Sequence, residues 1–255
     1  MHSRFTRLPG FLSLLIVIAM VLHGPISQLA HYHDFADQSQ WMGIPHAADV
    51  LSNLGFVLVA ALGFYHLARS SRRMIKVISY PAYGMFIVSL LLTAAGSWFY
   101  HLAPDDARLF WDRLPIALAC ASLMCAVRAE NVSGMTKLSA VADLSLALAF
   151  AVFSVFWWKW TSDLRPYLLL QGLSLILIPV WQMIWRAPKA DRIAFGTAMI
   201  LYVFAKFAEL SDGAVLNLTH IVSGHSIKHL LAAIAAGVIV LRLLQRDREG
   251  KLDSV

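Results

Sequence analysis

Three histidines in two short motifs are the residues of this chain best suited to chemistry. His225 and His229 are four residues apart, and His101 follows Ser97 at the same spacing. Four residues make about one helical turn, so both members of each pair share one face of a helix. Three imidazoles are the ligand set of a catalytic zinc ion, whose fourth position is left for water. The two motifs therefore indicate a zinc site.

Two further residues near these motifs could assist a hydrolysis. Asp112 could accept a proton from zinc-bound water or orient it. Alternatively, it caps a helix that begins there, with Pro115 close behind. Ser97 could donate its hydroxyl to a developing oxyanion, or it could bond to a carbonyl of its own helix. Asp105 and Asp106 are expected to be solvated loop charges.

The alternative for a histidine pair near a membrane surface is contact with lipid headgroups. A further histidine at the same depth, with a serine and an aspartate beside it, favours a metal. The other seven histidines have no such pairing. His220 is the nearest competitor, because it precedes His225 by five residues.

The composition is that of a membrane protein. Of the 255 residues, 59% are hydrophobic and 14% are charged, whereas a soluble domain carries roughly a quarter charged residues. Apolar stretches long enough to cross a bilayer recur along the chain. Eight are predicted, at residues 11–29, 51–68, 78–100, 113–128, 138–158, 166–185, 192–210 and 222–242. We therefore predict an all-α, multi-pass transmembrane helical bundle without a separate soluble domain.

The net charge of +6 reflects topology and does not predict a nucleic-acid partner. If all eight segments span the membrane, 15 of the 21 basic residues lie on one side. Basic loops remain in the cytoplasm, so both termini are predicted to be cytoplasmic. The end of the third segment and the beginnings of the fourth and eighth then meet at the outer face. The candidate residues Ser97, His101, Asp112, His225 and His229 would share that depth.

The first apolar segment could instead be a signal peptide. Arg4 and Arg7 precede an apolar run as in a signal peptide. Cleavage of a signal peptide requires small residues one and three positions before the cut. For a cut after Ala30, Gln28 occupies the second of these positions, so an uncleaved helix is expected. Cleavage would leave seven helices in the same orientation.

Cys120 and Cys125 are five apart in one segment and point in different directions, so no disulfide is expected between them.

Other charged residues lie near the predicted outer face. Lys206 and Glu209 can pair within the seventh segment and could support the structure or contact substrate. Carboxylates also gather in the external stretch of residues 30–50. They could hold a hard cation such as calcium, or they could be solvated loop charges: Asp34, Asp37 and Asp49.

Four motifs resemble those of the alkaline ceramidase family: SWFYH (97–101), FWDRLP (110–115), HSIKH (225–229) and DVLSNLGF (49–56). The resemblance implies a seven-helix core over residues 31–244, preceded by an extra transmembrane helix in 1–30 and followed by a cytoplasmic tail, 245–255. It implies zinc on His101, His225 and His229, with Ser97 and Asp112 as catalytic helpers. The implied reaction is hydrolysis of a ceramide-type amide to a sphingoid base and a fatty acid.

The resemblance also concerns calcium and the substrate. Eukaryotic members bind calcium through an N-terminal acidic stretch, and Asp34 and Asp37 match two of its positions. Ser39 and His46 stand where that pattern has Asn and Glu. The HDFADQ stretch (33–38) is more similar to bacterial members. Because many bacteria lack sphingolipids, the substrate could be another N-acyl lipid.

The leading hypothesis is a zinc-dependent membrane amidase whose lipid substrate enters from the outer leaflet. It would lie in a bacterial inner membrane, with its site at the periplasmic face. One alternative is a non-enzymatic receptor of the progestin and adipoQ type, which belongs to the same superfamily and shares the zinc constellation. A less favoured alternative is a metal or proton transporter. The sequence does not give the oligomeric state.

Overall fold

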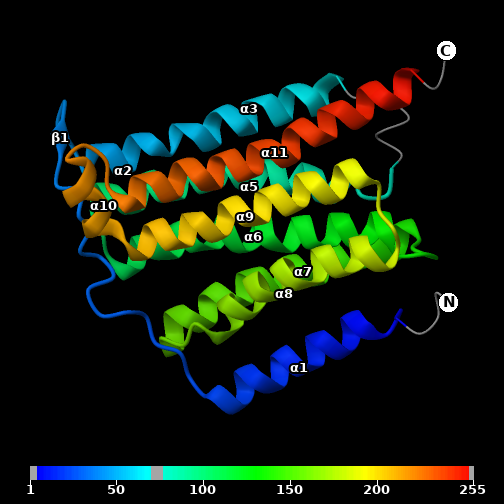
Figure 1. The fold of residues 1–255 in the computed structure, drawn as a ribbon. Coiled ribbons are helices and arrows are strands. Elements are labelled where there is room, and N and C mark those ends of the chain that lie inside the picture. Colours follow the sequence, from blue (N-terminus) through cyan, green and yellow to red (C-terminus); the bar gives the residue numbers. More distant parts are fainter. Residues whose placement is uncertain (1–4, 70–76, 253–255) are drawn as a thin grey trace.

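The computed structural model describes residues 5–69 and 77–252. Its long helices lie side by side in a single bundle (Figure 1). In chain order the elements are α1 (Leu8–His23), β1 (Gln40–Trp41), β2 (Ile44–Pro45), α2 (Ala47–Ser52), α3 (Leu54–Arg69), α5 (Tyr80–Leu102), α6 (Asp106–Asn131), α7 (Lys137–Thr161), α8 (Arg165–Ile184), α9 (Lys189–Leu210), α10 (Asp212–Thr219) and α11 (Gly224–Leu252). The predicted all-α bundle is confirmed.

Within the described residues, seven helical stretches are long and apolar enough to cross a membrane. The first of them combines α2 and α3 as Ala47–Arg69. Seven of the eight predicted segments are therefore helices of membrane-spanning length and apolarity, as expected for an integral membrane protein. Helix α1 is shorter than the predicted 11–29, because it ends at His23 before Gly24, whose φ is 79°, and Pro25. Its 16 residues extend about 24 Å, less than the roughly 30 Å of a hydrocarbon core.

The two chain ends lie at one end of the bundle, and β1, α2 and α10 lie at the other (Figure 1). We refer to the latter as the site end. Helix α5 ends there, and α6 and α11 begin there. The strands form a small antiparallel hairpin at this end, which hydropathy did not predict. Its two-residue turn has positive φ at Met42 (50°) and Gly43 (80°), as a type I′ hairpin requires.

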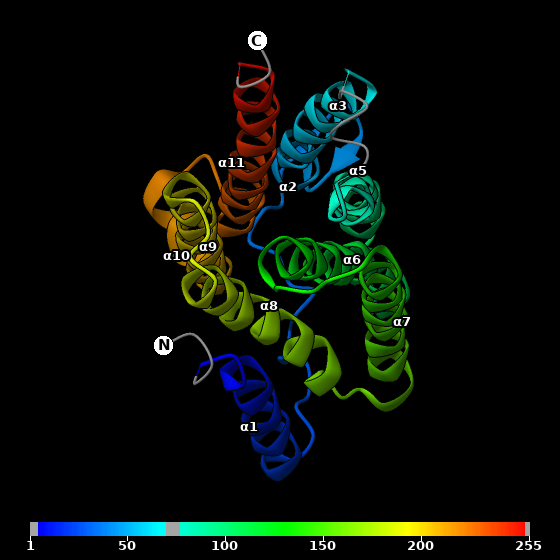
Figure 2. The ribbon, with the colours of Figure 1, turned by 90° about the vertical axis from the view of Figure 1, so that its right-hand side faces the viewer.

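Helix α6 occupies the middle of the bundle when it is viewed along the helices, between α5, α7 and α8, with α1 on the outside of α8 (Figure 2). Small residues allow close packing elsewhere. A Cβ atom on Gly55 would lie 2.9 Å from the Cβ of Ala233, and one on Gly63 would lie 2.8 Å from Ile87. Helix α3 therefore approaches α11 and α5 closely, as small residues permit in membrane helices.

An ionic network joins three helices at the end that carries the termini. Arg246 donates to Glu130 at 2.8 Å and to Asp191 at 3.0 Å. Arg242 donates to the same Asp191 oxygen at 2.6 Å. Since Glu130 belongs to α6, Asp191 to α9 and both arginines to α11, the network fixes these helices relative to one another at the end opposite the histidines.

Asp163 connects the segment after α1 to the start of α8. Its carboxylate accepts hydrogen bonds from the backbone N–H groups of Ile26 (3.0 Å) and Arg165 (3.1 Å) and from Trp157 Nε1 (3.1 Å). Burial acts to raise the pKa of this carboxyl, but these hydrogen bonds and the Arg165 side chain outweigh it and lower the pKa to about 2.

We therefore expect Asp163 to make stability depend on pH. Its folded pKa lies below its ordinary value of 3.8, so the stabilisation is present above that value and is lost as the pH falls towards about 2. Thermal unfolding in detergent, compared between the parent and Asp163→Asn, measures this contribution. The difference between their unfolding midpoints should narrow below pH 4; a difference independent of pH would contradict the assignment.

Candidate metal centre

The three histidines of the two motifs meet at the site end. One potential ligand atom from each of His101, His225 and His229 lies within 4.8 Å of the others. The ring centroids are 4.7–5.1 Å apart, and all three side chains are buried. His101 comes from the last turn of α5, and the other two come from the first turns of α11. The predicted histidine cluster is thus assembled in the structure.

His101 provides the test of whether a metal fits. Neither of its ring nitrogens has a hydrogen-bond partner among the described residues, although its side chain is fully buried. A buried polar atom without a partner costs about 1–3 kcal/mol, and such atoms are rare in proteins. A metal ion between the three imidazoles would provide a partner for one of these nitrogens. The histidine cluster therefore fits a metal.

His229 is held by helix α2 in an orientation that suits a ligand. Its Nδ1 atom lies 2.8 Å from Ser52 Oγ and 3.1 Å from the Asp49 carbonyl oxygen. Ser52 donates its own proton to that carbonyl at 2.8 Å, so its oxygen can accept the Nδ1 proton. This arrangement leaves the Nε2 lone pair for the cluster, as partners of metal-binding histidines commonly do.

The Asp49 side chain also connects α2 to α11. Its Oδ1 atom accepts hydrogen bonds from Ser223 Oγ (2.8 Å) and Ser226 Oγ (2.6 Å) at the start of α11. The solvated-loop alternative is wrong for this residue, because Asp49 is fully buried within α2. Sequence reasoning did not assign roles to Ser52 or Ser226; the DVLSNLGF resemblance was the available signal for the former.

His225 is positioned through Asp212, at the start of α10. The backbone N–H of His225 donates to Asp212 Oδ1 at 2.8 Å, and the backbone N–H of Ala36 donates to Asp212 Oδ2 at 2.9 Å. Lys228 lies 3.1 Å from His225 Nε2 and 2.8 Å from Glu209 Oε1. If His225 bound a metal through Nε2, Lys228 would lose its contact with that nitrogen and would keep its ion pair with Glu209.

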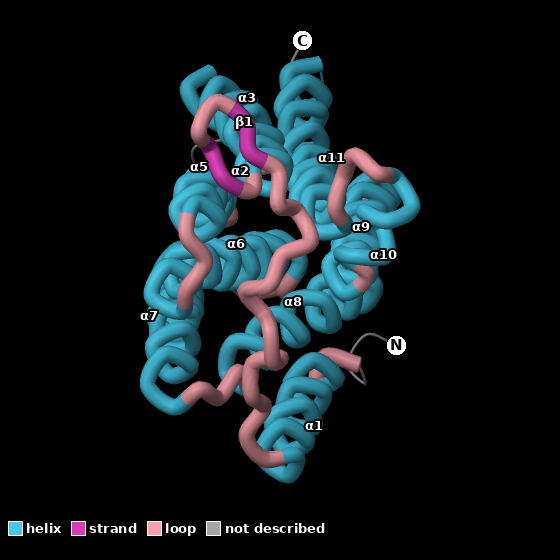
Figure 3. Tube along the Cα trace, turned by 90° about the vertical axis from the view of Figure 1, so that its left-hand side faces the viewer, coloured by secondary structure: helices cyan, strands magenta, loops and turns pink. Residues whose placement is uncertain are grey.

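Phe35 covers the histidine cluster. Its ring centroid lies 4.5 Å from that of His101 and 4.6 Å from that of His225, and the side chain is buried. Phe35 belongs to the segment between α1 and β1, which passes over the site end of the bundle (Figure 3). The Phe35 ring therefore shields the buried histidines from bulk water on this side.

Ser97 lies beside the histidines, and Asp112 lies beside Ser97. Ser97 Oγ is 3.5 Å from His229 Nε2, and the serine also interacts with the Asp112 carboxylate. The prediction that Asp112 caps a helix is wrong. Helix α6 begins at Asp106, and Asp105 caps it by accepting a hydrogen bond from the Arg108 N–H at 2.7 Å. Asp112 is buried about two turns beyond this cap.

Gly96 explains how Asp112 reaches this position. A Cβ atom on Gly96 would lie 2.0 Å from the carbonyl oxygen of Trp111 and 3.3 Å from the backbone nitrogen of Asp112. The backbones of α5 and α6 therefore touch where the candidate serine and aspartate face each other. Only glycine permits this approach, because any side chain would collide with backbone atoms that cannot rotate away.

Gly96→Ala should consequently separate the two helices at the site. We expect a loss of stability of about 1–3 kcal/mol from overpacking, together with loss of any activity that needs Asp112 beside Ser97. Gly84→Ala is the matched control, since a Cβ there meets no atom within 4 Å. The measurements are the unfolding midpoint in detergent and turnover. Equal behaviour of the two variants would show that the close approach is dispensable.

The two residues expected to bind calcium have separate partners. Asp34 is exposed, and its carboxylate lies 2.9 Å from His31 Nδ1. Asp37 is buried, and its two oxygens accept hydrogen bonds from the backbone N–H groups of Ser39 (2.9 Å) and Asp49 (3.0 Å). Within the described residues, the histidine cluster is the group of three or more potential ligands suitably placed for an ion. Calcium binding stays a prediction.

Lys206, Glu209 and His220 lie at the site end but outside the histidine cluster. Lys206 and Glu209 form the predicted ion pair at 2.8 Å. His220 lies outside the histidine cluster, because it ends α10 in a left-handed conformation and its side chain is exposed. Lys228, which shares Glu209 with Lys206, was not identified from the sequence, although it stands inside the HSIKH motif.

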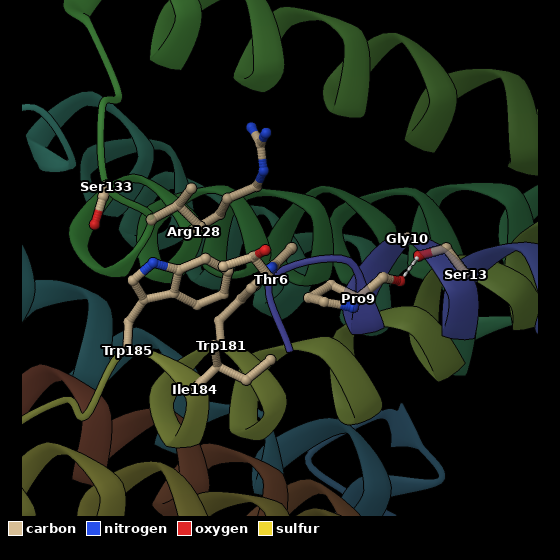
Figure 4. Close-up of a pocket in the computed structure, with 10 residues that line it drawn as sticks. Thr6, Pro9, Gly10, Ser13, Arg128, Ser133, Trp181, Ile184 and Trp185 are labelled. Atoms are coloured by element: carbon tan, nitrogen blue, oxygen red, sulfur yellow. Dashed lines mark hydrogen bonds between the residues drawn. The ribbon is translucent and has the colours of Figure 1, made fainter. Parts of the chain in front are cut away.

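A cavity of about 610 Å³ lies elsewhere, between α1 and the C-terminal parts of α6 and α8 (Figure 4). Its lining includes Trp181, Trp185 and Arg128 but none of the three histidines. The Arg128 guanidinium points away from the two indoles (Figure 4) and pairs with Asp143 of α7. This cavity is therefore separate from the candidate metal centre.

Neither a protein-family model nor a curated protein sequence matches this chain. The ceramidase resemblance consequently rests on the four motifs alone. Their residues converge at one end of the bundle: two motifs contribute the histidines, one contributes Asp112, and the fourth contributes Ser52.

Proposed function

We propose that the protein is a zinc-dependent amidase that hydrolyses a ceramide or related N-acyl lipid to a fatty acid and an amine. The observation that carries this proposal is the buried histidine cluster, in which His101 has two unpartnered nitrogens beside Ser97 and Asp112. Three imidazoles match the ligand set of hydrolytic zinc sites. The seven apolar spans suit a lipid substrate delivered from the membrane.

The side chains of the site have distinct roles in this proposal. Zinc would polarise the amide carbonyl and lower the pKa of a bound water. Asp112 accepts the proton from the attacking water and returns it to the nitrogen of the leaving amine. Ser97 donates its hydroxyl to the developing oxyanion. Ser52 holds the Nδ1 proton of His229, and Phe35 excludes bulk water.

The distribution of basic residues supports placing the site at the outer face of a bacterial inner membrane. Under this proposal the substrate reaches the site from the outer leaflet. A reporter fused after Val255 should read cytoplasmic, and one inserted between Ala103 and Asp105 should read external. The reverse pattern would overturn the proposed orientation but not the chemistry.

The reaction is tested by incubating purified protein with a panel of N-acyl lipids, with and without a chelator. Mass spectrometry would detect the released fatty acid. We expect release that the chelator abolishes and that added zinc restores. A protein that binds zinc but releases no fatty acid from any lipid would instead fit the receptor alternative.

A further inference from the structure

Arg113 is a buried cation next to the candidate site. It follows Asp112 in α6, and the residue is 4% exposed. Its guanidinium carbon lies 4.0 Å from the ring centroid of Trp158, 5.2 Å from that of Tyr32 and 5.7 Å from that of Tyr167. Helices α7 and α8 and the segment between α1 and β1 thus surround this charge with aromatic rings.

Among the described residues, Arg113 forms no close ion pair, and the Asp112 carboxylate acts on its charge only at longer range. Its Nη1 atom is fully buried and makes no hydrogen bond. Aromatic faces attract a buried cation, but they supply no oxygen acceptor for the guanidinium N–H groups that have left water. An anion would supply such acceptors.

The carboxylate beside the two neighbouring lysines is not free to act as that anion. Lys206 and Lys228 share one carboxylate, Glu209, at 2.8 Å each. Tyr32 lies within electrostatic range of both lysines and also contacts Arg113. This side of the site therefore gathers three cations. Three other carboxylates at the site end are already engaged: Asp37, Asp49 and Asp212 accept hydrogen bonds from backbone N–H or hydroxyl groups.

We infer that Arg113 binds an anionic headgroup of the lipid substrate, a carboxylate or a phosphate close to the scissile amide. This inference rests on the proposed amidase function and narrows its substrate to acidic N-acyl lipids. A guanidinium matches the two oxygens of either group in bidentate fashion. Consecutive side chains of a helix point in different directions, but the charge of Arg113 acts on the Asp112 carboxylate. An acid held by Arg113 would therefore lie within electrostatic range of the group that protonates the leaving amine.

The first test compares matched substrates on the parent protein. N-palmitoylglycine carries a carboxylate, N-palmitoylphosphoethanolamine carries a phosphate, and N-palmitoylethanolamine is neutral. Loss of a hydrogen bond to a charged group costs about 1.5–3 kcal/mol, so kcat/KM should be about 10–100-fold higher for an acidic substrate. The two acidic lipids distinguish carboxylate from phosphate.

The second test assigns the preference to Arg113. Arg113→Gln should reduce the ratio of kcat/KM between the preferred acidic lipid and the neutral lipid by about tenfold or more, whereas Arg113→Lys should retain part of the preference. Arg192→Gln is the matched control, since Arg192 is exposed at the end that carries the termini. It should behave as the parent does.

A binding measurement provides a readout that does not depend on turnover. Palmitate and hexadecyl phosphate should raise the unfolding midpoint of the parent in detergent more than hexadecanol does, and Arg113→Gln should lose the difference. Equal cleavage of neutral and acidic lipids by the parent would overturn the inference and leave the amidase standing. If no lipid is cleaved, the proposed reaction fails. The binding comparison then decides the Arg113 site, and equal midpoint shifts for all three compounds would overturn it.

Discussion

Replacing His229 with alanine is expected to reduce the zinc content from about one ion per chain to less than a tenth of that value. His101→Ala and His225→Ala should act similarly. A catalytic zinc ion is held by three protein ligands, and removing any one of them should abolish most of the affinity. Metal content of the purified variants, measured by mass spectrometry and normalised to protein, provides the test.

Two control variants sharpen this expectation. His220→Ala should keep its zinc, because His220 is exposed at the end of α10, outside the histidine cluster. Ser52→Ala should weaken zinc binding by about 10–100-fold without abolishing it, since Ser52 only orients the ring of His229. Equal losses from His220→Ala and His229→Ala would refute the assignment of the ligands.

The seven spans and the meeting of the motifs could be predicted because they depend on local patterns. Apolar runs of membrane-spanning length identify helices without knowledge of their neighbours. The four-residue spacing of His225 and His229 places both on one helical face. Successive spans alternate in direction, so counting them brings His101 and Asp112 to the same end. Each of these steps uses only the order of residues along the chain.

Element boundaries were less predictable, because polar caps and turns do not alter a hydropathy average in a specific way. The apolar window placed the start of the α6 segment at residue 113, but the helix begins at Asp106. Its first turn is polar and is stabilised by the Asp105 cap. The same error made Asp112 a candidate cap. In α1, the Gly24–Pro25 turn ends the helix although Ile26 and Leu29 continue the apolar pattern.

The contacts that orient the site could not be derived from spacing. Ser52 and His229 are separated by 177 residues, and their hydrogen bond exists because α2 packs against α11. Gly96 is unremarkable in a membrane helix until the Trp111 carbonyl is found against it. The unpaired state of Arg113 is likewise a property of three neighbouring elements. Such features depend on which helices become neighbours, which the sequence pattern leaves open.

Asp112→Asn is expected to separate catalysis from metal binding. The amide retains the size of the carboxylate and can still bond to Ser97, but it cannot accept a proton at neutral pH. If Asp112 moves the proton from water to the leaving amine, kcat should fall by about 10²–10⁴-fold. The zinc content should stay near that of the parent, because Asp112 is not among the clustered histidine ligands.

Ser97→Ala provides the comparison on the other side of the same contact. It removes one oxyanion donor, for which a loss of about 10²-fold or more is expected, and it leaves the proton acceptor in place. The pH dependence of turnover then distinguishes the two roles. Ser97→Ala should lower the rate without changing the profile, whereas Asp112→Asn should remove the limb that reports ionisation of the catalytic acid or base. Near-normal turnover in Asp112→Asn, with amidase activity established in the parent, would exclude the proposed proton transfer while the zinc site remained intact.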